Sequence, residues 1–196
     1  MGIEIEAKFK VDTHDALRER LRQAGALFVG RYLETNQLFD RPDRSLTAAG
    51  CGLRVRAVQT LEGRAGPHLL TYKGPRELAD LKVRPEIDVR IDDPDRAAEL
   101  LRALGYRAIL VFEKRRESWH LADAAIELDE VPEIGRFVEI EGPDEGAVRS
   151  ARSALGLADE TPVADTYVSL LIARTRGETP ARFLFHKDGG AYGRRI

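Results

Sequence analysis

About eight segments of this chain alternate between apolar and polar residues with a period of two. Such alternation is typical of β-strands whose two faces meet different surroundings. The first segment places Glu4, Glu6 and Lys8 on the face opposite to Ile5 and Phe9. The segments expected to form strands are Ile3–Lys10, Ala26–Phe39, Cys51–Gln59, Leu69–Lys73, Lys82–Ile91, Ala108–Leu121, Ala125–Asp129 and Phe137–Glu141.

Amphipathic stretches between these strands predict helices. One of them begins with the N-capping residue Asp93 and with Pro94, whose missing N–H costs nothing at a first helical position, and it ends at Gly105. The helices are expected at residues 14–24, 94–104, 145–155 and 164–174. Strands and helices in this order predict an α+β fold.

The length of 196 residues suits one domain, expected over residues 1–176. Beyond Gly177 the periodicity is lost, and residues 177–196 are predicted to form a C-terminal tail. Pro85 interrupts the fifth strand, where we expect a bulge or the rim of the sheet, because proline cannot donate a hydrogen bond to a neighbouring strand.

Charges of one sign recur along the polar faces of the strands. The acidic positions are Glu4, Glu6, Glu86, Asp88, Glu127, Asp129, Glu139 and Glu141, and the basic positions are Lys8, Arg54, Arg56, Lys73, Arg84, Arg90, Lys114 and Arg116. Each row alone is best explained as the solvated face of an amphipathic strand. Their repetition favours a closed sheet with a charged interior, because like charges on one open face repel each other. Acidic rows can bind divalent cations, and basic rows can bind phosphate groups.

Composition excludes several other classes of protein. The 31 Lys and Arg residues nearly balance the 33 Asp and Glu residues, and the net charge is −2. We therefore expect no nucleic-acid or membrane partner attracted by bulk charge. No apolar run approaches a membrane span and the N-terminus lacks a signal peptide, which predicts a cytoplasmic protein. The single cysteine and the dispersed histidines favour neither a disulfide nor a zinc site.

Several short motifs carry a family resemblance. Glu4-Ile5-Glu6-Ala7-Lys8 matches an ExExK signature, and the later motifs follow in the same order: Leu53–Arg56, Thr71–Gly74, Arg84–Asp88, Lys114–Arg116, Ile126–Asp129 and Gly135–Glu141. In these motifs the chain resembles the CYTH family, the triphosphate tunnel metalloenzymes. That family includes class IV adenylyl cyclases, thiamine triphosphatases and inorganic triphosphatases.

The resemblance implies a closed eight-stranded antiparallel β-barrel with helices packed outside, and a tunnel that binds a small-molecule triphosphate with Mg²⁺ or Mn²⁺. The implied metal ligands are Glu4, Glu6, Glu127, Asp129, Glu139 and Glu141. The implied phosphate-binding residues are Lys8, Arg54, Arg56, Lys73, Arg84, Lys114 and Arg116, among which Lys8 and Lys73 are also assigned catalytic roles. Tyr167 is expected to be an aromatic anchor that packs a helix against the barrel.

Three functions are compatible with these residues. Metal-dependent hydrolysis of inorganic, nucleoside or thiamine triphosphate is the leading prediction. A class IV adenylyl cyclase is the main alternative, because Asn36–Pro42 and residues 126–141 look somewhat like the cyclase branch. A non-catalytic module that binds polyphosphate or RNA is third, since it needs no carboxylate rows and the chain lacks clustered aromatic residues. The substrate, the general base and the oligomeric state are left open.

Overall fold

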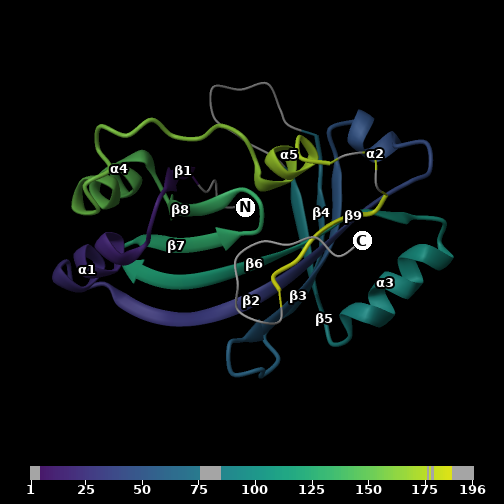
Figure 1. Cartoon of the computed structure of the whole chain (residues 1–196), viewed down its shortest axis with the longest axis horizontal. Coiled ribbons are helices and arrows are strands. Elements are labelled where there is room, and N and C mark those ends of the chain that lie inside the picture. Colours follow the sequence, from purple (N-terminus) through teal and green to yellow (C-terminus); the bar gives the residue numbers. More distant parts are fainter. Residues whose placement is uncertain (1–4, 76–84, 176, 178, 187–196) are drawn as a thin grey trace.

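The computed structural model describes residues 5–75, 85–175, 177 and 179–186. Its main body is an antiparallel sheet in the order β1-β8-β7-β6-β2-β3-β4-β5 (Figure 1). A short strand, β9, pairs in parallel with β6. The strands are β1 (Ile5–Val11), β2 (Leu27–Asp40), β3 (Gly52–Thr60), β4 (His68–Lys73), β5 (Glu86–Ile91), β6 (Arg107–Leu121), β7 (Ala124–Val131), β8 (Gly135–Gly142) and β9 (Ala181–Phe183). The predicted α+β class and the predicted strands are thereby confirmed.

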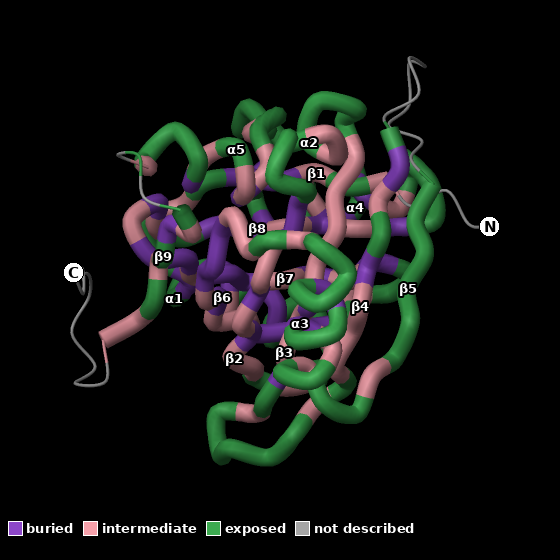
Figure 2. The backbone as a smooth tube through the Cα atoms, turned by 90° about the vertical axis from the view of Figure 1, so that its right-hand side faces the viewer, coloured by how far each residue is buried: buried purple, intermediate pink, exposed green. Residues whose placement is uncertain are grey.

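Closure of the sheet into a barrel is not confirmed. Within the described residues β1 pairs only with β8, and β5 pairs only with β4, so these two strands are the edges of the sheet. Strand β5 is exposed along almost its whole length (Figure 2). A closed barrel requires hydrogen bonds between the first and last strands. The described structure is an open sheet that twists strongly from β8 to β5 (Figure 1).

Three helices cover one face of this sheet. Helices α1 (Asp15–Gln23) and α4 (Glu145–Ala154) pack apolar side chains such as Leu21 and Val148 against Ile126 and Ile140. Helix α3 (Pro94–Ala103) packs Ala98 and Leu101 against Phe39 and Val55. As predicted, the Asp93 side chain accepts hydrogen bonds from the backbone of the first turn of α3. These helices lie where the sequence places them.

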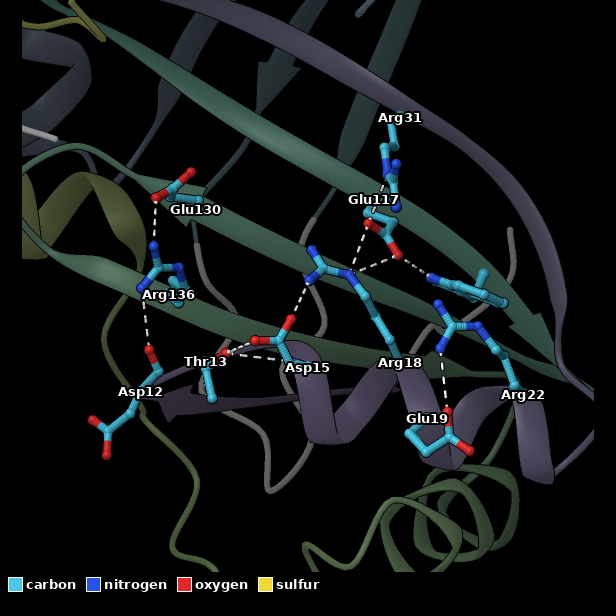
Figure 3. A network of polar contacts seen from close by, with 11 residues as sticks. Asp12, Thr13, Asp15, Arg18, Glu19, Arg22, Arg31, Glu117, Glu130 and Arg136 are labelled. Atoms are coloured by element: carbon cyan, nitrogen blue, oxygen red, sulfur yellow. Dashed lines mark hydrogen bonds and ion pairs between the residues drawn. The ribbon is translucent and has the colours of Figure 1, made fainter. Parts of the chain in front are cut away.

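A buried glutamate on β6 helps to hold α1 against the sheet (Figure 3). The Glu117 carboxylate accepts hydrogen bonds from Arg31 Nε at 2.8 Å, Arg18 Nε at 3.1 Å and Trp119 Nε1 at 2.9 Å. Burial alone would raise the pKa of Glu117, but these donors lower it below its usual range. The ion pairs join α1, β2 and β6.

Helix α5 (Tyr167–Ile172) lies on the opposite face of the sheet from α1, α3 and α4. Tyr167 and Leu171 pack with Leu110, Phe112 and Phe137, and this apolar cluster fills one end of that face. The expectation that all helices pack outside therefore needs correction. Apolar residues replace charged ones at this end of β6 and β8, so α5 can bury its own apolar side there.

The structure also tests the expectations about Pro85 and the C-terminal tail. Pro85 directly precedes β5 and does not interrupt it. Residues 181–183, part of the predicted tail, form β9 beside β6. A short helix, α2 (Ser45–Ala48), was not predicted. No helix within the described residues has the length and apolar character needed to cross a membrane.

Candidate functional site

The strand register places the predicted site residues on one side of the sheet. Directly opposite residues in an antiparallel pair point to the same side, so the pairing can be followed from strand to strand. Lys8 lies opposite Glu139, which lies opposite Glu127, and Asn36 lies opposite Arg56. We call this side the charged face; it carries Glu6, Lys8, Glu34, Asn36, Arg54, Arg56, Thr71, Lys73, Glu86, Asp88, Arg90, Lys114, Arg116, Glu127, Asp129, Glu139 and Glu141.

Two predicted site residues cannot be placed. Glu4, a predicted metal ligand, and Arg84, a predicted phosphate-binding residue, lie outside the described residues. All the other predicted site residues lie on the charged face.

Arg116 forms the centre of a buried ion cluster. Its Nη2 lies 2.7 Å from Asp129 Oδ2 and 2.7 Å from Glu139 Oε2, and its Nε lies 3.6 Å from Glu127 Oε2. Burial opposes the charge on each of these groups. The guanidinium nevertheless holds the pKa of Asp129 well below its usual range, and Asp129 in turn holds the pKa of Arg116 above its own. Arg116, which was predicted to bind phosphate, is therefore paired in this structure with carboxylates that were predicted to bind the metal.

Lys8 joins the acidic residues of β1 and β8. Its Nζ lies 3.4 Å from Glu139 Oε1 and 3.9 Å from Glu6 Oε1, and it donates a hydrogen bond to the Asp165 carbonyl at 3.1 Å. It also lies 4.3 Å from the centroid of the Tyr167 ring, a cation–π contact. Lys8 is thus buried and positioned by contacts on several sides.

Tyr167 is more than an aromatic anchor. It packs edge-on against Phe137, and its Oη donates a 3.0 Å hydrogen bond to Asp129 Oδ2. Burial and the neighbouring carboxylates raise its pKa well above the usual range, so the phenol stays protonated as a donor. Tyr167 links α5 directly to the ion cluster.

Glu34 on β2 is a site residue that the sequence reasoning missed. Its carboxylate lies 3.3 Å from Lys114 Nζ and 3.8 Å from Arg56 Nη1. Burial alone would raise the pKa of Glu34, but Lys114, Arg116 and Arg56 lower it to about 2. One sequence feature could have identified Glu34: it lies two residues before Asn36, on the same face of a strand that carries polar side chains on both faces.

Several polar atoms of β2 and β3 are buried without a hydrogen-bond partner among the described residues. They are both amide atoms of Asn36 and the Nε atoms of Arg54 and Arg56. Burial and the neighbouring Arg56 lower the pKa of Arg54 to about 10. Buried polar groups are almost always hydrogen-bonded in native proteins, so these atoms point to a ligand or ordered water at this place.

Lys73 lies nearer the open edge of the sheet. Its Nζ contacts Glu86 Oε2 at 2.7 Å, and both side chains are about one-third exposed at 37% and 36%. On the same strands, Thr71 donates a hydrogen bond to Asp88. The structure therefore brings Lys8, Lys114 and Arg116 into one buried cluster and leaves Lys73 at the side of β4 and β5.

The carboxylates of the charged face have the chemistry that Mg²⁺ or Mn²⁺ requires, because both ions prefer hard oxygen ligands. In the register Glu6 lies opposite Glu141, and Glu127 lies opposite Glu139. Burial raises the pKa of Glu127 and of Glu139, and Asp129 adds to the effect on Glu139. Raised carboxyl pKa values mark a place that favours added positive charge.

The donor set therefore fits a divalent cation by its chemistry. Within the described part of the chain, which lacks Glu4, no three such side chains already converge on a common point. Glu139 instead contacts Lys8 and Arg116. A cation held here would compete with these two side chains for the same carboxylate oxygens.

Comparison with known proteins finds similar sequences. The family model for the CYTH domain matches residues 2–167. The chain is 37% identical over 141 residues to a protein of Aeromonas hydrophila named "Adenylate cyclase CyaB", covering 70% of this chain and 67% of that protein. It is 30% identical over 139 residues to "Putative adenylate cyclase MJ0240" of Methanocaldococcus jannaschii, covering 71% and 76%.

The fold has solved counterparts as well. The structure of the PH1819 protein from Pyrococcus horikoshii OT3 superposes with a TM-score of 0.73 at 29% identity, covering 88% of this chain and 99% of that one. The match to the family model spans every motif singled out in the sequence. The chain belongs to the CYTH family.

Proposed function

We propose that this protein is an enzyme that binds a small-molecule triphosphate on the charged face and hydrolyses it with Mg²⁺ or Mn²⁺. The observation that carries the proposal is the set of buried basic groups whose donors have no partner, above all Nε of Arg54 and Nε of Arg56. Leaving a buried donor unpaired is costly, and phosphate oxygens would satisfy both guanidinium groups in the planar fork geometry that arginine favours.

Phosphoryl transfer asks little covalent chemistry of a protein, so positioning and charge stabilisation carry most of the catalysis. In the proposal Arg54, Arg56 and Lys114 bind phosphate oxygens. Lys8 and Lys73 stand on either side of them and neutralise charge on the reacting and departing groups. Closure of the barrel, with β1 approaching β5, would bring Lys73 toward the rest of the site and exclude water from it.

The acidic residues supply the second half of the site. Glu6, Glu139 and Glu141, together with Glu4, are proposed to hold the divalent cation. When bound, that cation neutralises phosphate oxygens and polarises the bond to be broken. Arg116 holds the pKa of Asp129 well below its usual range, so the oxygens of Asp129 remain acceptors at neutral pH.

Adenylate cyclase activity is the second candidate, and the names of two relatives favour it. The same phosphate and metal ligands would serve both reactions. The difference lies in the nucleophile: water attacks the terminal phosphorus in hydrolysis, whereas the ribose 3′-hydroxyl attacks the α-phosphorus in cyclisation.

The decisive experiment is a substrate panel of tripolyphosphate, ATP and thiamine triphosphate with Mg²⁺ or Mn²⁺. Orthophosphate, pyrophosphate and cyclic AMP are measured separately. Orthophosphate release supports the proposal, whereas cyclic AMP with equimolar pyrophosphate from ATP supports the cyclase. If no product forms from any substrate, the enzyme proposal fails and the non-catalytic phosphate-binding module becomes the better explanation.

Glu6→Gln tests the metal half of the site. It removes one negative charge from a half-exposed side chain, so the fold is expected to survive while metal-dependent turnover falls at least tenfold. Glu99→Gln, on the solvent side of α3, is the matched control and should retain full turnover. Wild-type turnover in Glu6→Gln would remove this residue from the metal site.

A further inference from the structure

Asn36 is the only asparagine of the chain and one of its most deeply buried polar residues, with 1% of its surface exposed. Neither the amide nitrogen nor the amide oxygen has a hydrogen-bond partner among the described residues. A side chain with two such groups lowers stability unless something else binds it.

The surroundings of Asn36 indicate what that partner is. On the charged face Asn36 lies directly opposite Arg56 on β3 and directly opposite Phe112 on β6. The next pairs along the strands are Leu38 with Arg54 on one side and Glu34 with Lys114 on the other. Three cationic side chains and the Glu34 carboxylate therefore occupy strand positions next to this neutral amide. An anion drawn to them would carry its oxygens to the Asn36 amide.

We propose that Asn36 is a direct ligand contact and that its Nδ2 donates a hydrogen bond to a phosphoryl oxygen held by Arg54 and Arg56. The inference rests on the proposed triphosphate site and adds to it a neutral donor. Because the amide does not titrate, it binds the phosphoryl group without adding to the repulsion among the surrounding cations. Asn36 is then a substrate-binding residue. Its unpaired amide lowers the stability of the empty protein, and the hydrogen bond to the phosphoryl group offsets that loss.

This role predicts opposite effects on stability and binding. Asn36→Leu keeps the number and branching of the side-chain heavy atoms and removes both unpaired groups, so the ligand-free protein should be more stable, with a Tm higher by roughly 2–6 °C. The same change removes a hydrogen bond to a charged ligand and should weaken tripolyphosphate binding roughly 10- to 100-fold. If Asn36 were instead purely structural and hydrogen-bonded to buried water, replacing it with leucine would lower the stability of the protein.

Binding is measured by titration calorimetry with tripolyphosphate in the presence of EDTA, so that hydrolysis does not interfere. Gln37→Leu is the matched control. Gln37 is the next residue of β2, points to the other side of the sheet and contacts Arg102 of α3. The Gln37→Leu variant also loses a side-chain amide, and it should leave the dissociation constant for tripolyphosphate unchanged.

A second measurement observes Asn36 in the wild-type protein. Growth on ¹⁵N-asparagine labels a single side-chain amide, because the chain contains one asparagine. Adding tripolyphosphate should move its two proton resonances and slow their exchange with water. This measurement stands even if Asn36→Leu fails to fold.

The outcomes separate the inference from the function on which it rests. If wild-type protein binds none of tripolyphosphate, ATP and thiamine triphosphate, with or without a divalent cation, the proposed function fails. If wild-type protein binds while the Asn36 amide resonances stay fixed, or while Asn36→Leu binds equally well, the triphosphate site stands and the role of Asn36 is wrong. Lower stability of Asn36→Leu together with unchanged binding would assign the residue to the fold alone.

Discussion

Glu34→Gln offers a quantitative test of the electrostatics of the charged face. The Glu34 carboxylate lies 3.3 Å from Lys114 Nζ and 3.8 Å from Arg56 Nη1, and only 4% of the residue is exposed. Its pKa falls from the ordinary value of 4.5 to about 2 in the folded protein. That difference corresponds to about 3 kcal/mol of stability at neutral pH, at about 1.4 kcal/mol per pKa unit.

The sign of this contribution fixes its pH dependence. A carboxyl group whose pKa is depressed by folding stabilises the protein above its unfolded pKa, and the contribution is lost as pH falls toward the folded value. The stability gap between wild type and Glu34→Gln should therefore be about 3 kcal/mol at pH 7 and shrink to about 2 kcal/mol at pH 3.5. At pH 7 the variant should melt roughly 6–12 °C below the wild type.

The assay is urea denaturation of both proteins at pH 7 and at pH 3.5, followed by circular dichroism without phosphate. A gap that is equal at the two pH values would refute the assigned electrostatics, as would its absence at pH 7. Binding gives an independent readout: because Glu34 competes with phosphate for Lys114 and Arg56, the variant should bind tripolyphosphate more tightly. Glu117→Gln, a buried glutamate on the other side of the sheet, should lose stability without this gain.

Three further changes test separate parts of the site. Tyr167→Phe removes the 3.0 Å hydrogen bond to Asp129 and should cost about 1–3 kcal/mol in urea denaturation; an unchanged midpoint would mean that the bond contributes nothing. Lys73→Ala should weaken tripolyphosphate binding by roughly tenfold in calorimetry, about 1.4 kcal/mol, and unaltered affinity would exclude Lys73 from the site. EDTA should abolish turnover yet leave Tm unchanged, since the ion cluster around Arg116 holds its carboxylates without a metal; a large fall in Tm would show a structural metal.

The positions of the charges could be predicted from the sequence because side chains on a strand alternate with a fixed period. Once the strands were found, Glu6, Lys8, Lys114 and Arg116 could point only to one of two sides, and the register confirms a common side. The pairings among them could not be predicted. Which carboxylate meets which cation depends on the order of strands and on the residues that lie opposite each other, and neither is encoded locally.

Glu34 and Asn36 were missed for a related physical reason. Strand β2 has 14 residues, and both of its sides carry polar groups in the middle, so the apolar pattern does not show which side is buried. The neighbouring strands distinguish the two sides of β2, because β3 and β6 both carry cationic residues on the side of Glu34. The position of α5 was equally hidden, because an amphipathic helix shows that it packs but does not show against which face.

The pairing of acids with bases on the charged face links the two halves of the proposed site. In the described structure Asp129 and Glu139 are bound by Arg116, and Lys8 adds a second cation to Glu139. A triphosphate that draws Arg116 and Lys8 to its own oxygens leaves these carboxylates without compensation. In the proposed site a divalent cation would restore it. We therefore expect phosphate binding to increase the affinity for metal and, by thermodynamic reciprocity, metal binding to increase the affinity for phosphate. In the empty protein the acidic and basic residues of the charged face therefore pair with one another in place of the metal and the phosphate.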